Sequence, residues 1–176
     1  MTASALRVQF SEEIRVDHAE LRRLIEHGFA GIDPDGVEVR VERAARSRDS
    51  FTGRAYPEPP RRPKPHPATQ YLVRLKVPGA LRSRGYPQSY QYPRRKTAPR
   101  IVVHDWRERF IALVAHEAFH VRQFREGLRR SEVAAERWAA QILLRIRTGD
   151  GSGPTSEGSQ PAAGTAPVQI ALFGLG

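Results

Sequence analysis

The clearest helical pattern near the start of the chain covers residues 17–29. Leu21, Leu24 and Ile25 recur at the three- and four-residue spacing that places side chains on one face of a helix. Asp17 precedes them and is a residue type that caps helix N-termini. The segment therefore predicts an amphipathic helix that buries one stripe of side chains.

Two further helical patterns lie close together in the last third of the chain. They cover residues 106–126 and 132–147 and are separated by Gly127, a residue type that commonly follows a helix end. Ser131 stands just before the second pattern, where a hydroxyl can accept from a free backbone N–H. We expect a pair of consecutive helices.

Three segments have the pattern of strands. In VEVRV, residues 37–41, valines alternate with charged residues, as in a half-buried strand. Two more apolar runs follow, YLVRLKV at residues 71–77 and IVVHDW at residues 101–106. Helices and strands together predict an α+β domain with a small sheet of three or more strands packed against the helix pair.

Between the strands lie two segments rich in proline and basic residues. Residues 44–69 predict an extended loop without regular hydrogen bonding, and residues 78–99 predict a second loop rich in Arg and Tyr. Residues 40–100 contain 16 Arg or Lys against three Asp or Glu, a net charge of +13 in a chain whose formal net charge is +10. The loops either bind phosphates or form a solvated basic surface. The candidate nucleic-acid contacts are Arg61, Arg62, Lys64, Arg94, Arg95 and Lys96.

The strongest chemical motif is VAHEAFHV in the first helix of the pair. His116 and His120 are four residues apart, so both imidazoles leave the same helix face and can bind one ion. Glu117 lies beside the first ligand, where a general base is needed. The alternative is a pair of ordinary histidines, each satisfied by a hydrogen bond. We predict a zinc site with Glu117 as the catalytic residue.

The chain has no cysteine, so a third protein ligand must be a histidine or a carboxylate. No histidine follows His120, and the next helix offers Glu132 and Glu136. In an antiparallel hairpin with a rise of about 1.5 Å per residue, Glu136 falls about 3 Å from the level of His120 and Glu132 about 9 Å away. This geometry favours Glu136.

Residues 100–147 resemble the gluzincin metallopeptidases, in which an HExxH helix is followed by a helix that supplies a glutamate ligand. Several branches read ExxxD in the second helix, with the first acid as ligand and the second supporting a histidine; Glu132 and Glu136 occupy those places. The resemblance therefore favours Glu132, and the choice stays open. The gluzincin resemblance implies a minimal zincin-like domain. In such a domain zinc lowers the pKa of its bound water to about 7, and Glu117 takes the proton from that water.

Features around the motif suggest how a substrate is held. The strand that ends at His104 and Asp105 precedes the motif helix, and such an edge strand can align an extended peptide by backbone pairing. Asp105 is better explained as a helix cap. Tyr86, Tyr90 and Tyr92 are either oxyanion donors or anchors of their loop.

The tail of the chain, residues 149–176, has the composition of a flexible linker but ends in apolar residues. Residues 169–173, QIALF, resemble the short peptide that binds the bacterial sliding clamp, with Gln first and Leu-Phe last. The alternative is a tail that folds back onto the domain, residues 1–148. The candidate partner-binding residues are Gln169, Ile170, Leu172 and Phe173.

The zinc motif, the basic loops and the clamp-type tail together are similar in design to the Spartan and SprT-like proteases, which act on proteins crosslinked to DNA. Those proteases use a third histidine, which this chain lacks after His120. We predict a cytoplasmic, DNA-associated zinc peptidase without a membrane segment. The alternatives are a regulatory peptidase that cleaves one intracellular partner and a non-catalytic DNA- or clamp-binding module with a structural metal.

Overall fold

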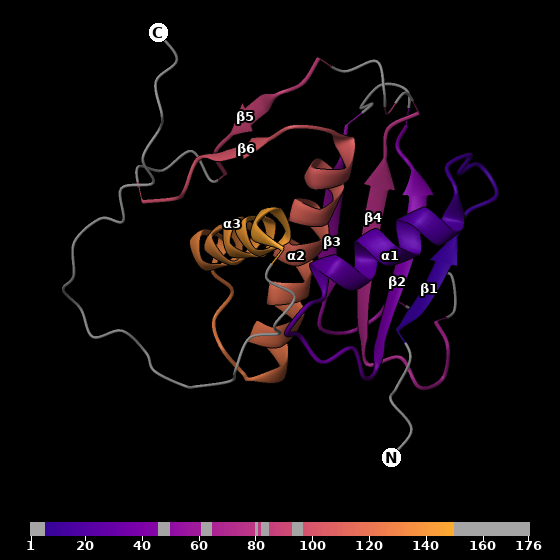
Figure 1. Ribbon diagram of the computed structural model, residues 1–176. Helices are drawn as coiled ribbons and strands as arrows, with labels where there is room; N and C mark the ends of the chain where they lie inside the picture. Colours follow the sequence, from indigo (N-terminus) through magenta and orange to yellow (C-terminus); the bar gives the residue numbers. More distant parts are fainter. Residues whose placement is uncertain are drawn as a thin grey trace, which may run out of the picture.

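The computed structural model describes residues 6–45, 50–60, 65–79, 81, 85–92 and 97–149, and they form an α+β fold. A four-stranded sheet has the helices α1 and α2 on one face, and α3 crosses α2 on the side away from α1 (Figure 1). A separate two-stranded sheet lies near the start of α2. The α+β class expected from the sequence is confirmed.

The main sheet has the strand order β1-β2-β4-β3. Strands β1, β2 and β4 are parallel, whereas β3 runs antiparallel to β4 at the edge. The strands of this sheet are β1 (Arg7–Phe10), β2 (Val37–Arg43), β3 (Thr52–Tyr56) and β4 (Tyr71–Val77). The second sheet pairs β5 (Gln88–Tyr90) with β6 (Ile101–Val103) in antiparallel fashion.

Three of these strands were not predicted from the sequence. Strand β1 was missed, β3 lies inside the segment 44–69 that was expected to be an irregular loop, and β5 lies inside the expected loop 78–99. The loop predictions were wrong at these places because short strands depend on their partners. The sequence TGRAY of β3 has no apolar alternation of its own and is held by pairing with β4.

Strand β2 is buried on both faces, although the alternation of valine with charged residues predicted a half-buried strand. Glu38 and Arg40 are buried beside their valine neighbours. The Glu38 carboxylate accepts hydrogen bonds from the backbone N–H of His66 and the hydroxyl of Thr69, so the segment before β4 covers this face of the sheet. A buried ion pair with Arg40 makes the charged residue tolerable there.

The three helices begin at the residues that the capping signals indicated. Asp17, Asp105 and Ser131 cap their helices, each with a side-chain oxygen that accepts from a backbone N–H of the first turn. Gly127, which follows the end of α2, has a φ of 64°, a conformation that glycine adopts without strain. The helices are α1 (His18–Gly28), α2 (Trp106–Arg125) and α3 (Glu132–Thr148).

Helix α2 is the centre of the core. Its residues from Phe110 to Ala118 are all buried because the sheet, α1 and α3 cover different sides of the helix (Figure 1). A helix that is apolar on nearly every side belongs inside a domain, so polar side chains on this helix require a specific explanation. No helix within the described residues is both long enough and apolar enough to span a membrane.

Candidate metal centre

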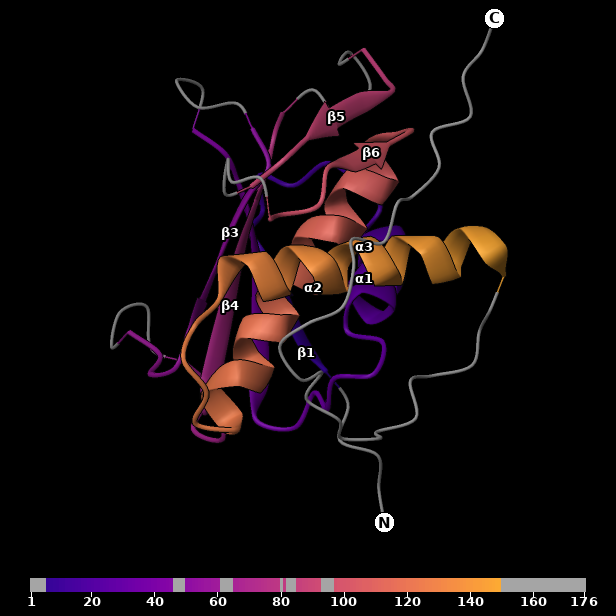
Figure 2. The same ribbon diagram turned by 90° about the vertical axis from the view of Figure 1, so that its left-hand side faces the viewer.

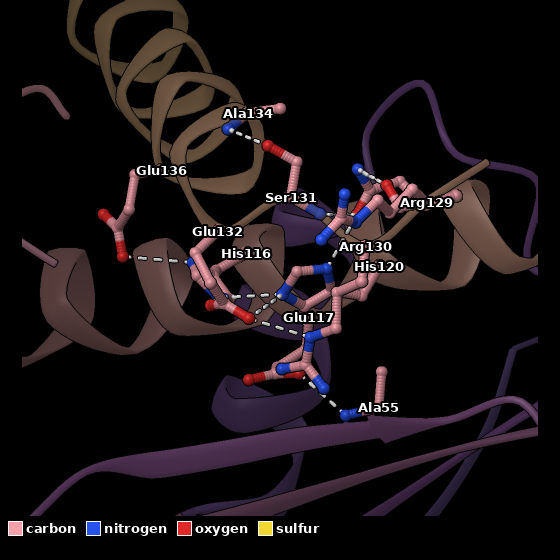
Figure 3. A network of polar contacts seen from close by, with 11 residues as sticks. Ala55, His116, Glu117, His120, Arg129, Arg130, Ser131, Glu132, Ala134 and Glu136 are labelled. Atoms are coloured by element: carbon pink, nitrogen blue, oxygen red, sulfur yellow. Dashed lines mark hydrogen bonds and ion pairs between the residues drawn. The ribbon is translucent and has the colours of Figure 1, made fainter. Parts of the chain in front are cut away.

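The two motif histidines lie in the middle of α2 and face α3. His116 and His120 are one helical turn apart, and both are buried, with exposed fractions of 7% and 0%. Glu132 is the first residue of α3, and its carboxylate reaches the same point (Figure 3). Helix α2 and the start of α3 thus bring three candidate ligands together.

The ligand atoms are close enough to share one ion. The Nε2 atoms of His116 and His120 are 3.1 Å apart, and the Glu132 carboxylate lies 3.1 Å from the first and 3.5 Å from the second. Two ligand atoms at tetrahedral positions about 2.0–2.1 Å from a zinc ion are about 3.3 Å apart. Within the described residues, His116, His120 and Glu132 are the group whose ligand atoms all lie within 4.8 Å of one another.

Glu136 contacts His116 from the other side of the ring. Its Oε1 lies 3.0 Å from Nδ1 of His116, an ion-pair contact without the angle of a good hydrogen bond. The hairpin geometry expected from the sequence, which favoured Glu136 as the ligand, does not hold because α3 crosses α2 steeply (Figure 2). The crossing brings the first residue of α3, Glu132, to the Nε2 side, and leaves Glu136 on the Nδ1 side.

A glutamine that the sequence analysis overlooked fixes the proton of His120. The Nδ1 atom of His120 lies 2.8 Å from Oε1 of Gln123, and this oxygen also accepts from the backbone N–H of Ser131. The amide nitrogen of Gln123 donates to the carbonyl of Arg129, so the orientation of the amide is set. Nδ1 of His120 must therefore donate. The signal was present in the sequence, because Gln123 follows His120 by three residues on the same helix face.

The ring of His120 presents a lone pair to the point where the two rings and Glu132 meet. His120 carries its proton on Nδ1 because of Gln123, and the carboxylate of Glu136 favours a proton on Nδ1 of His116. The two Nε2 atoms lie 3.1 Å apart beside the Glu132 carboxylate, so either a proton on Nε2 of His116 or a cation among the three groups holds them together. Two imidazoles and one carboxylate are a donor set that fits a zinc ion when both rings are neutral.

Glu117 is placed beside this group and is anchored to the edge strand β3. Its Oε2 accepts a hydrogen bond of 2.7 Å from the backbone N–H of Ala55. Gly53 allows the close approach, since a Cβ there would lie 2.7 Å from Cγ of Glu117 and 2.9 Å from its Oε1. Burial raises the pKa of Glu117, which makes the carboxylate a better proton acceptor than an exposed one.

The pKa values of the two histidines are shifted in opposite directions. Burial lowers the pKa of His120 to about 4, so its imidazole is neutral, as a metal ligand must be. Burial also acts to lower the pKa of His116, but the contact with Glu136 and the charge of Glu117 raise it above its ordinary value. For Glu132 burial acts to raise the pKa, whereas His120 and Arg130 lower it, so the carboxylate is ionised.

Two strands lie close to the motif helix. Strand β6, which ends just before His104, pairs with β5 in the small sheet, and Asp105 is the cap of α2. The strand whose backbone contacts Glu117 is β3, at the edge of the main sheet. Alignment of a substrate by the strand that ends at His104 stays a prediction.

The three tyrosines of the second loop differ in their distance from the site. Tyr92 is 56% exposed, and its ring centroid lies 6.3 Å from that of His116. Tyr90 is packed under Arg109 at 3.8 Å, and burial raises its pKa to about 12. Tyr86 is packed against the core. Tyr92 is thus the tyrosine of this loop that lies beside a motif histidine.

The remaining predicted site residues lie outside the described part of the chain. These are the six basic loop residues Arg61, Arg62, Lys64, Arg94, Arg95 and Lys96. The tail residues Gln169, Ile170, Leu172 and Phe173 also lie outside it. Nucleic-acid contact and clamp binding therefore stay predictions from the sequence.

Comparisons with known proteins add no family to this geometry. A scan against protein-family models, a search of curated proteins and a search of solved structures each return no match for the chain. The chemistry of the site is therefore argued from its own residues.

Proposed function

We propose that this protein is a zinc-dependent peptidase, in which His116, His120 and Glu132 hold the ion and Glu117 is the general base. The observation that carries the proposal is the convergence of the Nε2 atoms of His116 and His120, 3.1 Å apart, with the carboxylate of Glu132. Two imidazoles and one carboxylate around one point are the ligand types of a catalytic zinc ion. We also propose that the α+β fold is a minimal zincin-like domain.

The proposed roles of the zinc ion and of the surrounding residues follow from the positions of the side chains. A bound zinc ion supplies Lewis acidity and makes water ionisable near neutral pH. Glu117 takes a proton from the attacking water and returns it to the leaving amine. The N–H of Ala55 holds one oxygen of Glu117 and so orients the carboxylate. Glu136 and Gln123 fix the two imidazole rings from behind.

A catalytic zinc site needs a coordination position that no protein ligand fills. Three protein ligands and one open position are typical of catalytic zinc, whereas structural zinc has four protein ligands. Among the described residues the candidate group has three members, His116, His120 and Glu132. This count supports the enzyme over the alternative of a binding module with a structural metal.

The proposal is tested by zinc binding and peptide hydrolysis in one set of variants. The purified protein is expected to bind one zinc ion and to cleave an unfolded protein such as casein. Glu117→Gln should keep the zinc and lose about 100-fold or more of the hydrolysis rate, because a general base contributes about 10²–10⁴-fold. His116→Ala should lose both zinc and activity.

A matched control at the C-cap of α2 separates the role of Glu117 from the general effect of removing a glutamate charge. Glu126→Gln makes the same chemical change at an exposed residue whose partner is Arg122, so zinc and activity should be unchanged. Full activity in Glu117→Gln would rule out the enzyme. One zinc ion per chain without any hydrolysis would favour the structural metal.

The predictions about DNA, a specific protein partner and the sliding clamp are also proposals, and the hydrolysis assay can be extended to test the first two. Cleavage measured with and without DNA distinguishes a DNA-associated peptidase, which DNA should stimulate, from a regulatory peptidase, for which DNA should make no difference. Binding of a peptide of residues 164–176 to a sliding clamp tests the tail. The cytoplasmic location stays a prediction.

A further inference from the structure

Arg130 lies beside Glu132, one of the three proposed metal ligands. It belongs to the loop between α2 and α3, and its Nε donates a 2.8 Å hydrogen bond to Oε1 of Glu132. Figure 3 shows its side chain reaching from the loop toward Glu132 and Glu117. Its side chain is 39% exposed and contacts the half-buried carboxylate of Glu132, so Arg130 lies where solvent meets the metal group.

The guanidinium has donors left over. Arg has five N–H donors in a planar fork, and within the described residues the polar contact of Arg130 is the one from Nε to Glu132. The four N–H groups of the two terminal nitrogens remain for another acceptor. A planar fork of this kind matches a carboxylate, which it binds through two parallel hydrogen bonds.

The position of the charge matters as much as the donors. The guanidinium of Arg130 lies beside the ligand Glu132 and reaches toward the general base Glu117 (Figure 3). Glu117, Glu132 and Glu136 contribute three negative charges when ionised. An ion of charge +2 and the guanidinium of charge +1 bring the sum to zero. Without Arg130 the loaded site would carry −1 and would repel an anionic substrate.

We infer that Arg130 is the substrate-recognition residue of the site and that it binds a carboxylate next to the scissile bond. This inference rests on the proposed peptidase function and deepens it by naming a substrate class. The carboxylate comes either from an acidic side chain of the substrate or from its free C-terminus. Both present the same planar group to Arg130, and the experiment distinguishes them.

The test measures the binding of three probes to the zinc-loaded full-length protein. Each probe is a dipeptide with a zinc-binding hydroxamate group attached at its N-terminus. The first has neutral side chains and an amidated C-terminus, the second has an aspartate side chain and an amidated C-terminus, and the third has neutral side chains and a free C-terminal carboxylate. One of the two carboxylate probes is expected to bind about 10- to 100-fold more tightly than the neutral probe, the range expected for hydrogen bonds to a charged group. The tighter of the two identifies the source of the carboxylate.

Variants then assign the preference to Arg130. Arg130→Met should abolish the preference, and Arg130→Lys, which keeps the charge but lacks the fork, should retain only part of it. Arg129→Met is the matched control, because Arg129 is the exposed neighbour and contacts Gln123 through its backbone carbonyl. It should keep the full preference.

Three results would overturn the inference. The first is equal binding of all three probes by the wild-type protein, and the second is a preference that persists in Arg130→Met. The third is a loss in Arg130→Met by the same factor for all three probes, which would mean that Arg130 only orients Glu132. In each case zinc titration of the same samples shows whether the metal site stands. Absence of zinc binding in the wild type would instead overturn the proposed function together with this inference.

Discussion

Among the described residues, buried charged side chains cluster on each face of the main sheet, and the two clusters are satisfied in different ways. On the face away from the helices, Oε1 of Glu38 accepts a 2.6 Å hydrogen bond from Arg40. Its Oε2 accepts from the N–H of His66 and the hydroxyl of Thr69. Every oxygen of this carboxylate has donors from the protein, which is the condition for a buried charge to be structural.

On the helix face two imidazoles and two carboxylates contact one another. The Nε2 atoms of His116 and His120 approach to 3.1 Å, and Gln123 holds the proton of His120 on the far side of its ring. Glu136 Oε2 is a buried oxygen without a hydrogen-bond partner. The comparison teaches that burial of charge alone does not mark a functional site. Imidazole nitrogens and a carboxylate that converge on one point, as His116, His120 and Glu132 do, are a stronger signal.

The largest expected effect breaks the structural cluster alone. Glu38→Ala removes the carboxylate that pairs with buried Arg40, and removing one partner of a buried ion pair costs about 3–5 kcal/mol. Urea denaturation of the metal-free protein should show this loss. The folded variant should still bind one zinc ion with the affinity of the wild type, because the cluster lies on the opposite face of the sheet from α2.

The half-exposed pair of Glu42 with Arg74 supplies the control. Glu42→Ala removes a carboxylate from the same strand, but the pair has exposed fractions of 27% and 32%, and a solvent-exposed ion pair contributes about 0–1 kcal/mol. If Glu38→Ala were as stable as Glu42→Ala, the Glu38 cluster would not be structural. Loss of zinc in Glu38→Ala would show that the two clusters are coupled.

A smaller effect is expected for the carboxylate behind His116. Glu136→Gln leaves the three ligands in place but removes the charge that holds the proton on Nδ1, and loss of such an outer partner costs about 10- to 100-fold in metal affinity. Competition titration with a zinc chelator measures it. Glu132→Gln should weaken binding more, because it alters a ligand. The reverse order would make Glu136 the ligand, as the hairpin estimate from the sequence favoured.

The motif could be predicted from the sequence because its geometry is local. Four-residue spacing within one helix fixes the relation of His116 to His120, and capping residues mark where α2 and α3 begin. The third ligand was not decided by the sequence. It depends on the angle at which α3 crosses α2, which the packing of the whole helix pair sets.

The parts of the fold that the sequence did not predict are all non-local. Strand β3 forms because residues Thr52–Tyr56 pair with β4. Glu38 is buried because residues 66–69 fold over it. The same strand supplies the N–H of Ala55 that holds Glu117. A feature of the site was therefore missed for the same reason as a feature of the fold.

The smallest expected effect is on the pH dependence of stability in the metal-free protein, which differs between the two clusters. Burial lowers the pKa of His120 from 6.5 to about 4. Between pH 6.5 and pH 4, His120 is therefore protonated in the unfolded chain and neutral in the folded protein. Stability from neutral His120 is thus complete above pH 6.5 and is lost as the pH falls toward 4. Burial acts to raise the pKa of Glu38, but its hydrogen bonds with His66, Thr69 and Arg40 lower it below 4.5, so its contribution is lost only at lower pH.

Urea denaturation at pH 6.5 and pH 4.5 of the wild type and of His120→Gln isolates the first window. The wild type should lose on the order of 2 kcal/mol more than the variant over this interval, because about 1.4 kcal/mol accompanies each unit of pKa difference. Both proteins retain His116, whose raised pKa stabilises the fold at low pH in each of them. Equal losses in both proteins would mean that His120 is not held neutral by the fold, and the lone-pair argument for the metal centre would lose its basis at that ring.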